Sequence, residues 1–282
     1  MREERADMAA EPTTEVPPKA DVPVVILCGG MGTRIREASE KLPKPLIDIG
    51  GKPILWHIMK TYEAAGFRRF ILCLGYKGDL IRRFFLDYGK FERDFTVRLG
   101  GGDEAVDWHG HTPSEDWEVT LVETGLLTGT GARVKRVRPY LDQPFYMMTY
   151  GDGIGNVDLD ALYRQHVASG KIGTVTGVHP TSRFGEMHVD GDEVTEFNEK
   201  PTMADGWVSG GFFGFRREMV DTYLDDDPDL LLEKKPLQTL AADGQMGVYR
   251  HDGFWMGMDT YRDWTELNQL WDTDRAPWKV WS

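Results

Sequence analysis

Strand-like and helix-like segments alternate along most of this chain, and that alternation restricts its possible folds more than any other feature of the sequence. Residues 22–28, VPVVILC, form a continuous apolar run rich in β-branched side chains, which is typical of a strand buried on both faces of a parallel sheet. Residues 53–65, PILWHIMKTYEAA, place their apolar side chains on one helical face. Pro53 suits the first turn of that helix and Gly66 suits its C-terminal cap.

The same alternation continues to residue 179 and then changes character. Further strands are predicted at 67–76, 119–125, 144–152 and 171–179, and further helices at 78–89, 131–141 and 158–170. Beyond residue 179 the pattern predicts a hairpin at 184–201, a strand at 208–215, a helix at 231–244, a strand from 246 and a last helix from 261. We therefore expect an α/β fold with a Rossmann-like, mixed and mostly parallel sheet flanked by helices.

Composition limits the partners and the location of the chain. A net charge of −13 disfavours nucleic acid as a partner, so a polyanionic substrate must be met by a few local cations and backbone N–H groups. No apolar run is long enough to span a membrane. Cys28 and Cys73 lie in apolar runs, which predicts buried, reduced thiols and a cytoplasmic location. Residues 1–21 are expected to be a disordered N-terminal extension.

A glycine-rich loop follows the first predicted strand. Gly29, Gly30 and Gly32 can form a nest of backbone N–H groups that binds an anion, although a purely structural turn remains an alternative. The loop lacks the ending of a Walker A motif and the third glycine of a dinucleotide fingerprint. Arg34 and Lys44 add two cations that can neutralise a triphosphate, and the prolines on both sides of Lys44 stiffen its backbone. An ordinary surface lysine is the alternative for Lys44.

Two carboxylates follow predicted strands, at the edge of the sheet where ligands of α/β proteins bind. Asp152 and Asp259 are hard oxygen ligands suited to Mg²⁺, which keeps several waters. The alternatives are a turn-forming Asp-Gly pair for Asp152 and a helix N-cap for Asp259. His109 and His111 suggest zinc, but without a nearby third ligand they favour a polar loop.

Taken together, these motifs resemble a known family. The pattern L-x-G-G-x-G-T-R at residues 27–34, followed by a Lys-Pro pair, resembles the nucleotide-binding signature of the sugar-1-phosphate nucleotidyltransferases. The resemblance to the glucose-1-phosphate cytidylyltransferases extends through PKPLIDIGGKPILWHIMKTY, GYKGD, VTLVETG, YGDG, RFGEMHV, FNEKP, SGGFF, GFWMGMDT and APWKVW. It covers nearly the whole chain from residue 22 onwards.

The resemblance implies a reaction and a set of site residues. The implied reaction joins CTP to glucose 1-phosphate with Mg²⁺, and it needs no general base because the attacking phosphate is already an anion. Arg34 and Lys44 would be catalytic, and the implied nucleotide-binding residues are Leu27, Gly29, Gly30, Gly32, Thr33, Arg34, Lys44, Thr124, Gly125 and Gly151. The implied sugar-phosphate residues are Arg183, Glu199, Lys200, Gly210 and Gly211, and the implied metal ligands are Asp152 and Asp259.

The resemblance also implies a division of the chain and an assembly. Residues 22–282 would form the nucleotidyltransferase domain, with a nucleotide-binding part at about 22–155 and a smaller sugar-binding and oligomerisation lobe at about 156–282. A homo-oligomer, trimer or hexamer, is expected. Two alternatives remain: the same chemistry with UTP, dTTP or another hexose 1-phosphate, and a sensor that binds these ligands without turnover.

Overall fold

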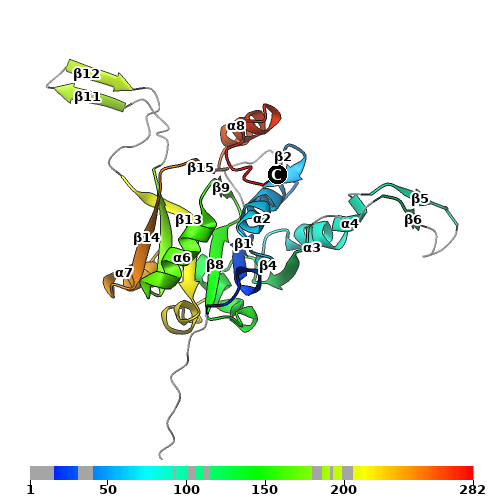
Figure 1. The fold of residues 1–282 in the computed structure, drawn as a ribbon, viewed down its shortest axis with the longest axis horizontal. Helices are drawn as coiled ribbons and strands as arrows, with labels where there is room; N and C mark the ends of the chain where they lie inside the picture. The colour runs from blue at the N-terminus through cyan, green and yellow to red at the C-terminus, as the bar shows by residue number, and fades with distance from the viewer. Residues whose placement is uncertain are drawn as a thin grey trace, which may run out of the picture.

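A seven-stranded sheet in the order β14-β10-β13-β8-β1-β4-β7 forms the centre of this computed structural model (Figure 1). The structure describes residues 16–30, 41–91, 93–100, 106–110, 115–179, 186–190, 193–198 and 206–281. The strands are β1 (Pro23–Leu27), β4 (Arg69–Leu74), β7 (Glu118–Glu123), β8 (Phe145–Tyr150), β10 (Gly173–Val178), β13 (Val208–Arg216) and β14 (Met246–His251). Strand β13 is antiparallel to its neighbours β8 and β10, and the other neighbouring pairs are parallel. The expected mixed, mostly parallel sheet is confirmed.

Helices cover both faces of the sheet because successive residues of a buried strand point to opposite sides. Val24 and Ile26 pack into one core with α2 and α6, whereas Val25 packs into a second core with α5 and α7. The helices are α2 (Ile54–Ala64), α3 (Gly78–Leu86), α4 (Tyr88–Phe91), α5 (Thr130–Arg136), α6 (Leu159–Ser169), α7 (Lys235–Ala242) and α8 (Tyr261–Asp272). Within the described ranges, none of them is both long and apolar enough to cross a membrane.

Two helices begin and end at the residues that the sequence predicted as their boundaries. Helix α2 begins directly after Pro53, and the chain leaves it through Gly66 at φ 100°, a left-handed conformation that favours glycine. Helix α6 is capped by Asp158, whose side chain accepts a hydrogen bond from the backbone N–H of Ala161, and it ends at Gly170 with φ 67°. Local capping chemistry therefore sets these boundaries.

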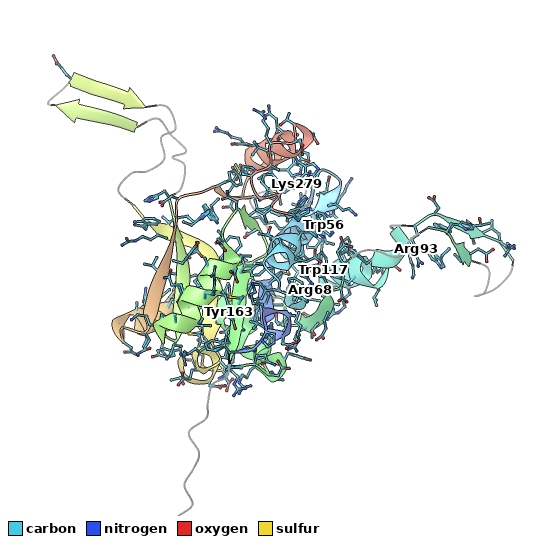
Figure 2. The ribbon with its side chains drawn as sticks, viewed as in Figure 1. Trp56, Arg68, Arg93, Trp117, Tyr163 and Lys279 are labelled. Carbon is cyan, nitrogen blue, oxygen red and sulfur yellow. The ribbon has the colours of Figure 1, made fainter. Side chains whose placement is uncertain are left out.

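Four two-stranded sheets lie outside the central sheet: β2 (Asp48–Ile49) with β3 (Lys52–Pro53), β5 (Phe95–Val97) with β6 (Val106–Trp108), β9 (Gly153–Gly155) with β15 (Trp255–Gly257), and β11 (Glu186–Asp190) with β12 (Glu193–Asn198). The β11–β12 pair forms the hairpin that the sequence predicted. The β5–β6 pair forms an arm that leaves the body beyond α4, and Figure 2 labels Arg93 at its base. The guanidinium of Arg93 lies over the ring of Trp108 on this arm.

The chain before β1 is in contact with the body. Residues Lys19–Asp21 form a 3₁₀ turn, and the ammonium of Lys19 forms an ion pair with Asp160 of α6 at 2.5 Å. The described chain thus begins at Val16, before the expected boundary at residue 22. The prediction of disorder for residues 1–15 lies outside the described residues.

The end of α8 and the segment that follows it pack against a buried histidine of α2. His57 is fully buried, and the rings of Trp56, Trp271, Trp278 and Trp281 lie around it with centroid distances between 4.6 and 6.2 Å. Nε2 of His57 lies 2.9 Å from the carbonyl oxygen of Ile49, so this nitrogen carries the proton, and Nδ1 accepts from the indole N–H of Trp278 at 3.4 Å. This neutral ring holds the segment after α8 against α2; Trp56 and Lys279 mark the place in Figure 2.

The buried imidazole predicts acid sensitivity. Burial lowers the pKa of His57 from 6.5 to about 4, so the unfolded chain takes up this proton first as the pH falls. The His57 contribution to stability is complete above pH 6.5 and is lost between pH 6.5 and about 4, up to about 3 kcal/mol. We measure the free energy of unfolding in urea at pH 7 and at pH 5. Between these two pH values we expect it to fall by about 2 kcal/mol more in wild type than in His57→Gln. Equal losses in both proteins would contradict this role, because other titrating groups are common to the two.

Candidate active site

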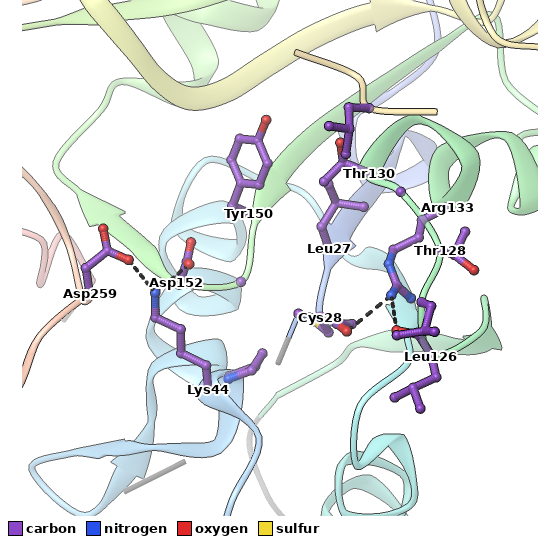
Figure 3. A pocket seen from close by; sticks show the side chains of 17 residues that line it. Leu27, Cys28, Lys44, Leu126, Thr128, Thr130, Arg133, Tyr150, Asp152 and Asp259 are labelled. Carbon is purple, nitrogen blue, oxygen red and sulfur yellow. Dashed lines mark hydrogen bonds and ion pairs between the residues drawn. The ribbon is translucent and has the colours of Figure 1, made fainter. Parts of the chain in front are cut away.

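A cavity of about 470 Å³ lies at the carboxyl ends of β1 and β8, the edge at which the glycine loop leaves the sheet (Figure 3). Its described lining comprises Leu27, Cys28, Gly29, Gly30, Lys44, Pro45, Leu126, Leu127, Thr128, Gly129, Thr130, Arg133, Tyr150, Gly151, Asp152, Leu231 and Asp259. Four of these residues are charged, two positive and two negative. The cavity therefore combines an apolar wall with a small set of charges, as small-molecule sites do.

The ammonium of Lys44 lies between the two predicted metal ligands. Its Nζ is 2.7 Å from Oδ2 of Asp152 and 2.8 Å from Oδ1 of Asp259, and Figure 3 shows both contacts. The side chain of Lys44 is only 11% exposed. Lys44 is the first residue of the 3₁₀ turn Lys44–Leu46, and it lies between Pro43 and the buried Pro45. The two prolines restrict the backbone and so fix the direction from which the side chain of Lys44 enters the cavity. The surface-lysine alternative is thereby excluded.

The two acids converge because a short ribbon joins the segments that carry them. Strand β9 starts directly after Asp152, β15 ends two residues before Asp259, and the two strands pair antiparallel with Gly153 opposite Gly257. The backbone N–H of Met258 donates to the carbonyl of Asp152 at 2.9 Å, which extends the pairing to the acids. This ribbon brings together residues that are 107 positions apart in the sequence.

The N-cap alternative for Asp259 is wrong. Thr260 is the N-cap of α8 and forms a capping box with Asp263, whose carboxylate also accepts from the backbone N–H of Asp259 at 2.9 Å. The helix start is therefore satisfied by other residues, and the Asp259 carboxylate faces Lys44.

Arg133 of α5 is a buried cation that the sequence analysis did not single out. Its guanidinium donates to the carbonyl oxygens of Leu74 at 2.9 Å and of Gly29 and Leu126 at 3.2 Å each, and to the hydroxyl of Thr124 at 2.7 Å. These acceptors lie at or just beyond the carboxyl ends of β1, β4 and β7. One side chain thus joins the ends of three adjacent strands, and its four acceptors are uncharged oxygens.

Arg133 belongs to a run of basic residues in the predicted helix at 131–141, and such a run is typical of a solvated face. Arg133 stands between Ala132 and Val134, both buried, whereas Lys135 and Arg136 follow outside that small apolar pair. The apolar residues on both sides of Arg133 are the sequence feature that distinguishes this buried arginine from the solvated basic residues after it. Burial lowers the pKa of Arg133 from its usual value, although an arginine in a protein keeps its charge.

Two of the predicted nucleotide-binding glycines on the lining are closely packed against the protein itself. A Cβ at Gly29 would lie 2.1 Å from Nη1 of Arg133, and a Cβ at Gly151 would lie 2.9 Å from the carbonyl oxygen of Leu27. At Gly30, in contrast, no described atom lies within 4 Å of the position of a Cβ. Five residues that the sequence analysis gave as nucleotide-binding line the cavity: Leu27, Gly29, Gly30, Lys44 and Gly151.

Other predicted site residues lie off the cavity lining. Thr124 is fully buried, and its hydroxyl donates to the carbonyl of Leu74 while accepting from Arg133. Gly125 follows it at φ 88°. Gly210 accepts a hydrogen bond from the indole of Trp255, and Gly211 at φ 78° packs against the ring of Tyr150. Gly32, Thr33, Arg34, Arg183, Glu199 and Lys200 fall outside the described residues, as does His111.

The wall of the cavity opposite Lys44 is polar as well as apolar, which the sequence did not suggest. The hydroxyl of Tyr150 donates to Glu233, and the hydroxyl of Thr130 donates to the other oxygen of the same carboxylate at 2.7 Å. Thr130 in turn accepts from the backbone N–H of Leu232 at 2.9 Å. This network joins the end of β8 to the start of α5, so the wall is held in place.

Cys28 lines the cavity and is buried, as the sequence predicted. It is 1% exposed, and burial, with a smaller effect of Cys73, raises the pKa of its thiol well above the usual value. A thiol that stays protonated is a poor nucleophile.

The chain is similar to proteins of known type. Residues 23–271 match the family model described as nucleotidyl transferase. The chain is 43% identical to a probable glucose-1-phosphate cytidylyltransferase of Bacillus subtilis, over 91% of this chain and 99% of that protein. It is 42% identical to the glucose-1-phosphate cytidylyltransferase of Salmonella typhimurium, over 91% and 98%. HddC from Yersinia pseudotuberculosis has a similar fold, with a TM-score of 0.63 at 24% identity, over 89% of this chain and 99% of that chain.

The contact between Gly29 and Arg133 predicts a difference between adjacent glycines. We expect Gly29→Ala to displace the guanidinium and to lower the free energy of unfolding by about 1–3 kcal/mol, since buried hydrogen bonds are lost. Gly30→Ala serves as the matched control and should stay within about 0.5 kcal/mol of wild type. Denaturant unfolding of the three proteins tests this. Equal stabilities of the two variants would show that Arg133 does not need the space at Gly29.

Proposed function

Because this chain belongs to the nucleotidyl transferase family, we propose that it condenses CTP with α-D-glucose 1-phosphate to give CDP-glucose and pyrophosphate. The observation that carries the proposal is the cavity at the carboxyl ends of the strands, in which Lys44, Asp152 and Asp259 meet. Relatives at 42–43% identity over nearly their whole length carry the name of this activity.

In the proposed reaction, a phosphate oxygen of glucose 1-phosphate attacks the α-phosphorus of CTP. The new P–O bond forms as the bond to the β-phosphate oxygen breaks, and pyrophosphate leaves with that electron pair. The nucleophile is already an anion, so the protein must position two polyanions and balance their charge rather than remove a proton. Lys44 and Arg133 supply positive charge at the cavity, and Arg34 is proposed to supply more.

Asp152 and Asp259 are proposed to hold Mg²⁺. The two carboxylates are close enough together to contact one cation, because the ammonium of Lys44 contacts both of them. Two carboxylates together with phosphate oxygens form an oxygen donor set that suits Mg²⁺, and the ion would stabilise negative charge on the phosphates. The same two acids are held by the β9–β15 ribbon, so their spacing does not depend on a ligand.

The sugar phosphate is proposed to bind near Tyr150. Gly211 packs on the ring of Tyr150, which places the start of β13 next to the cavity wall. Arg183, Glu199 and Lys200 remain proposed sugar-phosphate residues. Thr124 and Gly125 remain proposed residues of the base and ribose pocket, and the hydroxyl of Thr124 accepts a hydrogen bond from Arg133, which lines the cavity.

The choice of CTP rests on the names of the relatives rather than on contacts in the cavity. The same chemistry with UTP, dTTP or another hexose 1-phosphate is therefore the nearest alternative. Base choice depends on a few hydrogen bonds and can change with few substitutions. A sensor without turnover is less well supported, because binding alone does not require both Asp152 and Asp259 beside Lys44.

The enzyme is further proposed to act in the cytoplasm as a homo-oligomer. Cys28 and Cys73 are free, buried thiols, as expected in a reducing compartment. The β5–β6 arm carries exposed apolar side chains: Phe95 is 54% exposed, and Val97, Leu99 and Trp108 are exposed as well. Apolar surface on a projecting arm is suited to contact with a second copy of the chain.

Pyrophosphate release tests the activity directly. With glucose 1-phosphate and Mg²⁺, we expect release with CTP to exceed release with UTP, dTTP, ATP and GTP by at least about tenfold. Lys44→Ala should lower this rate by at least about a hundredfold, because a charge beside the phosphates is lost. Preference for another nucleotide would keep the chemistry and overturn the base assignment. Binding of CTP without release, with every sugar phosphate tested, would favour the sensor.

The assembly is tested by light scattering coupled to size-exclusion chromatography. We expect the wild-type chain to have the mass of a trimer or hexamer. Substitution of Phe95 and Trp108 together by serine should shift the distribution towards smaller species, since these side chains face solvent in the single chain. A monomer for the wild type would contradict the proposed assembly, and an unchanged oligomer in the variant would place the interface elsewhere.

A further inference from the structure

The contact between Lys44 and the two acids has a consequence for the order of events at the site. The ammonium lies 2.7 Å from Asp152 and 2.8 Å from Asp259. These are the distances of charge-assisted hydrogen bonds, so one oxygen of each carboxylate is already bound to the ammonium. A divalent cation bound by the same two oxygens would meet a positive charge at close range.

The charges on the described part of the cavity lining sum to zero. Lys44 and Arg133 contribute two positive charges, and Asp152 and Asp259 contribute two negative charges. Arg133 donates to uncharged oxygens, so of the two cations on the described lining it is Lys44 that pairs with the acids. A cation that binds the acids would release Lys44, whose ammonium then needs a new anionic partner.

We propose that Lys44 is the resident counter-cation of Asp152 and Asp259 in the nucleotide-free protein, and that a divalent metal ion and a phosphate group bind cooperatively because the metal displaces Lys44 towards the phosphate. The proposal rests on the proposed function for the identity of the phosphate ligand. Without phosphate, the charge of Lys44 lowers the affinity for the metal ion. With phosphate, the displaced ammonium pairs with the phosphate and no longer lowers that affinity.

The direction of this coupling follows from electrostatics and linkage. Two positive centres a few ångströms apart in a partly buried site repel each other by several times the thermal energy. Any factor by which phosphate raises metal affinity is also the factor by which metal raises phosphate affinity. Lys44 would thus disfavour binding of the bare metal and favour binding of the metal together with the nucleotide.

Titration of Mn²⁺ into the nucleotide-free full-length protein, followed by the electron paramagnetic resonance signal of free Mn²⁺, tests the proposal. Lys44→Gln removes the charge and keeps a polar side chain, and we expect it to bind Mn²⁺ roughly ten- to a hundredfold more tightly than wild type. Lys44→Arg keeps the charge and should remain within about threefold of wild type. Equal or weaker binding of Mn²⁺ by Lys44→Gln would overturn the proposal.

Two matched controls locate the effect. Lys41→Gln removes the same charge from an exposed residue three positions earlier, and we expect it to leave Mn²⁺ affinity within about twofold. Adding Asp152→Asn to Lys44→Gln should remove most of the gain, because the gained affinity depends on that carboxylate. An equal gain in Lys41→Gln would indicate a general charge effect and would contradict the specific role of Lys44.

A measurement on the wild-type protein keeps the proposal testable if the Lys44 variants do not fold. Reductive methylation of lysines, quantified by mass spectrometry of peptides, reports how accessible each side-chain nitrogen is to the reagent. Mg²⁺ above its measured dissociation constant should raise the methylation rate of Lys44 several-fold and leave that of Lys41 unchanged. A Lys44 rate that does not respond to bound Mg²⁺ would show that the metal does not displace it.

These experiments need neither CTP nor turnover. If pyrophosphate release fails with every nucleotide but Lys44→Gln binds Mn²⁺ more tightly, the proposed activity is wrong while the counter-cation role stands. If release occurs with CTP but metal affinity does not change in Lys44→Gln, the activity stands and the counter-cation role is wrong.

Discussion

The contact of one ammonium with two carboxylates is the interaction on which the site depends. Lys44 is 108 positions from Asp152 and 215 from Asp259 in the sequence, so three distant segments must meet within 3 Å. The fold achieves this because β1 and β8 are parallel neighbours whose carboxyl ends meet at one edge, and because the β9–β15 ribbon brings the third segment to that edge. An error in any of these pairings would leave a charge in the cavity without a partner, which is costly at a partly buried position.

The order of the elements could be predicted from the sequence because the deciding interactions are local. Continuous apolar runs give strands buried on two faces, and β1 and β4 are such runs. Helix ends follow from capping residues, of which Pro53 and Asp158 are examples. The position of Asp152 at this edge also followed, since it comes directly after a predicted strand and ligands of α/β sheets bind at the carboxyl ends of strands.

The remaining features of the site depend on contacts between residues far apart in the chain, which a single sequence does not reveal. Arg133 belongs to a run of basic residues, and only its buried neighbours and its acceptors on three strand ends distinguish it from a solvated charge. The sequence alone could not exclude Asp259 as a helix cap, because it does not show that Thr260 and Asp263 complete that cap themselves. The hydrogen bond from Arg133 to the hydroxyl of Thr124 likewise joins residues whose contact the sequence does not reveal.

The glycine loop shows that a sequence signature can have more than one physical cause. A glycine after a buried strand is usually explained by the approach of a ligand to backbone N–H groups. At Gly29 the protein itself needs the space, because the guanidinium of Arg133 lies where a Cβ would be, whereas Gly30 has no such neighbour among the described atoms. The same loop therefore combines one glycine required by internal packing with another that remains open to the cavity. Because Arg133 also lines the cavity, the packing requirement and the binding requirement are linked: the residue that excludes a side chain at Gly29 is the one that brings positive charge to the site.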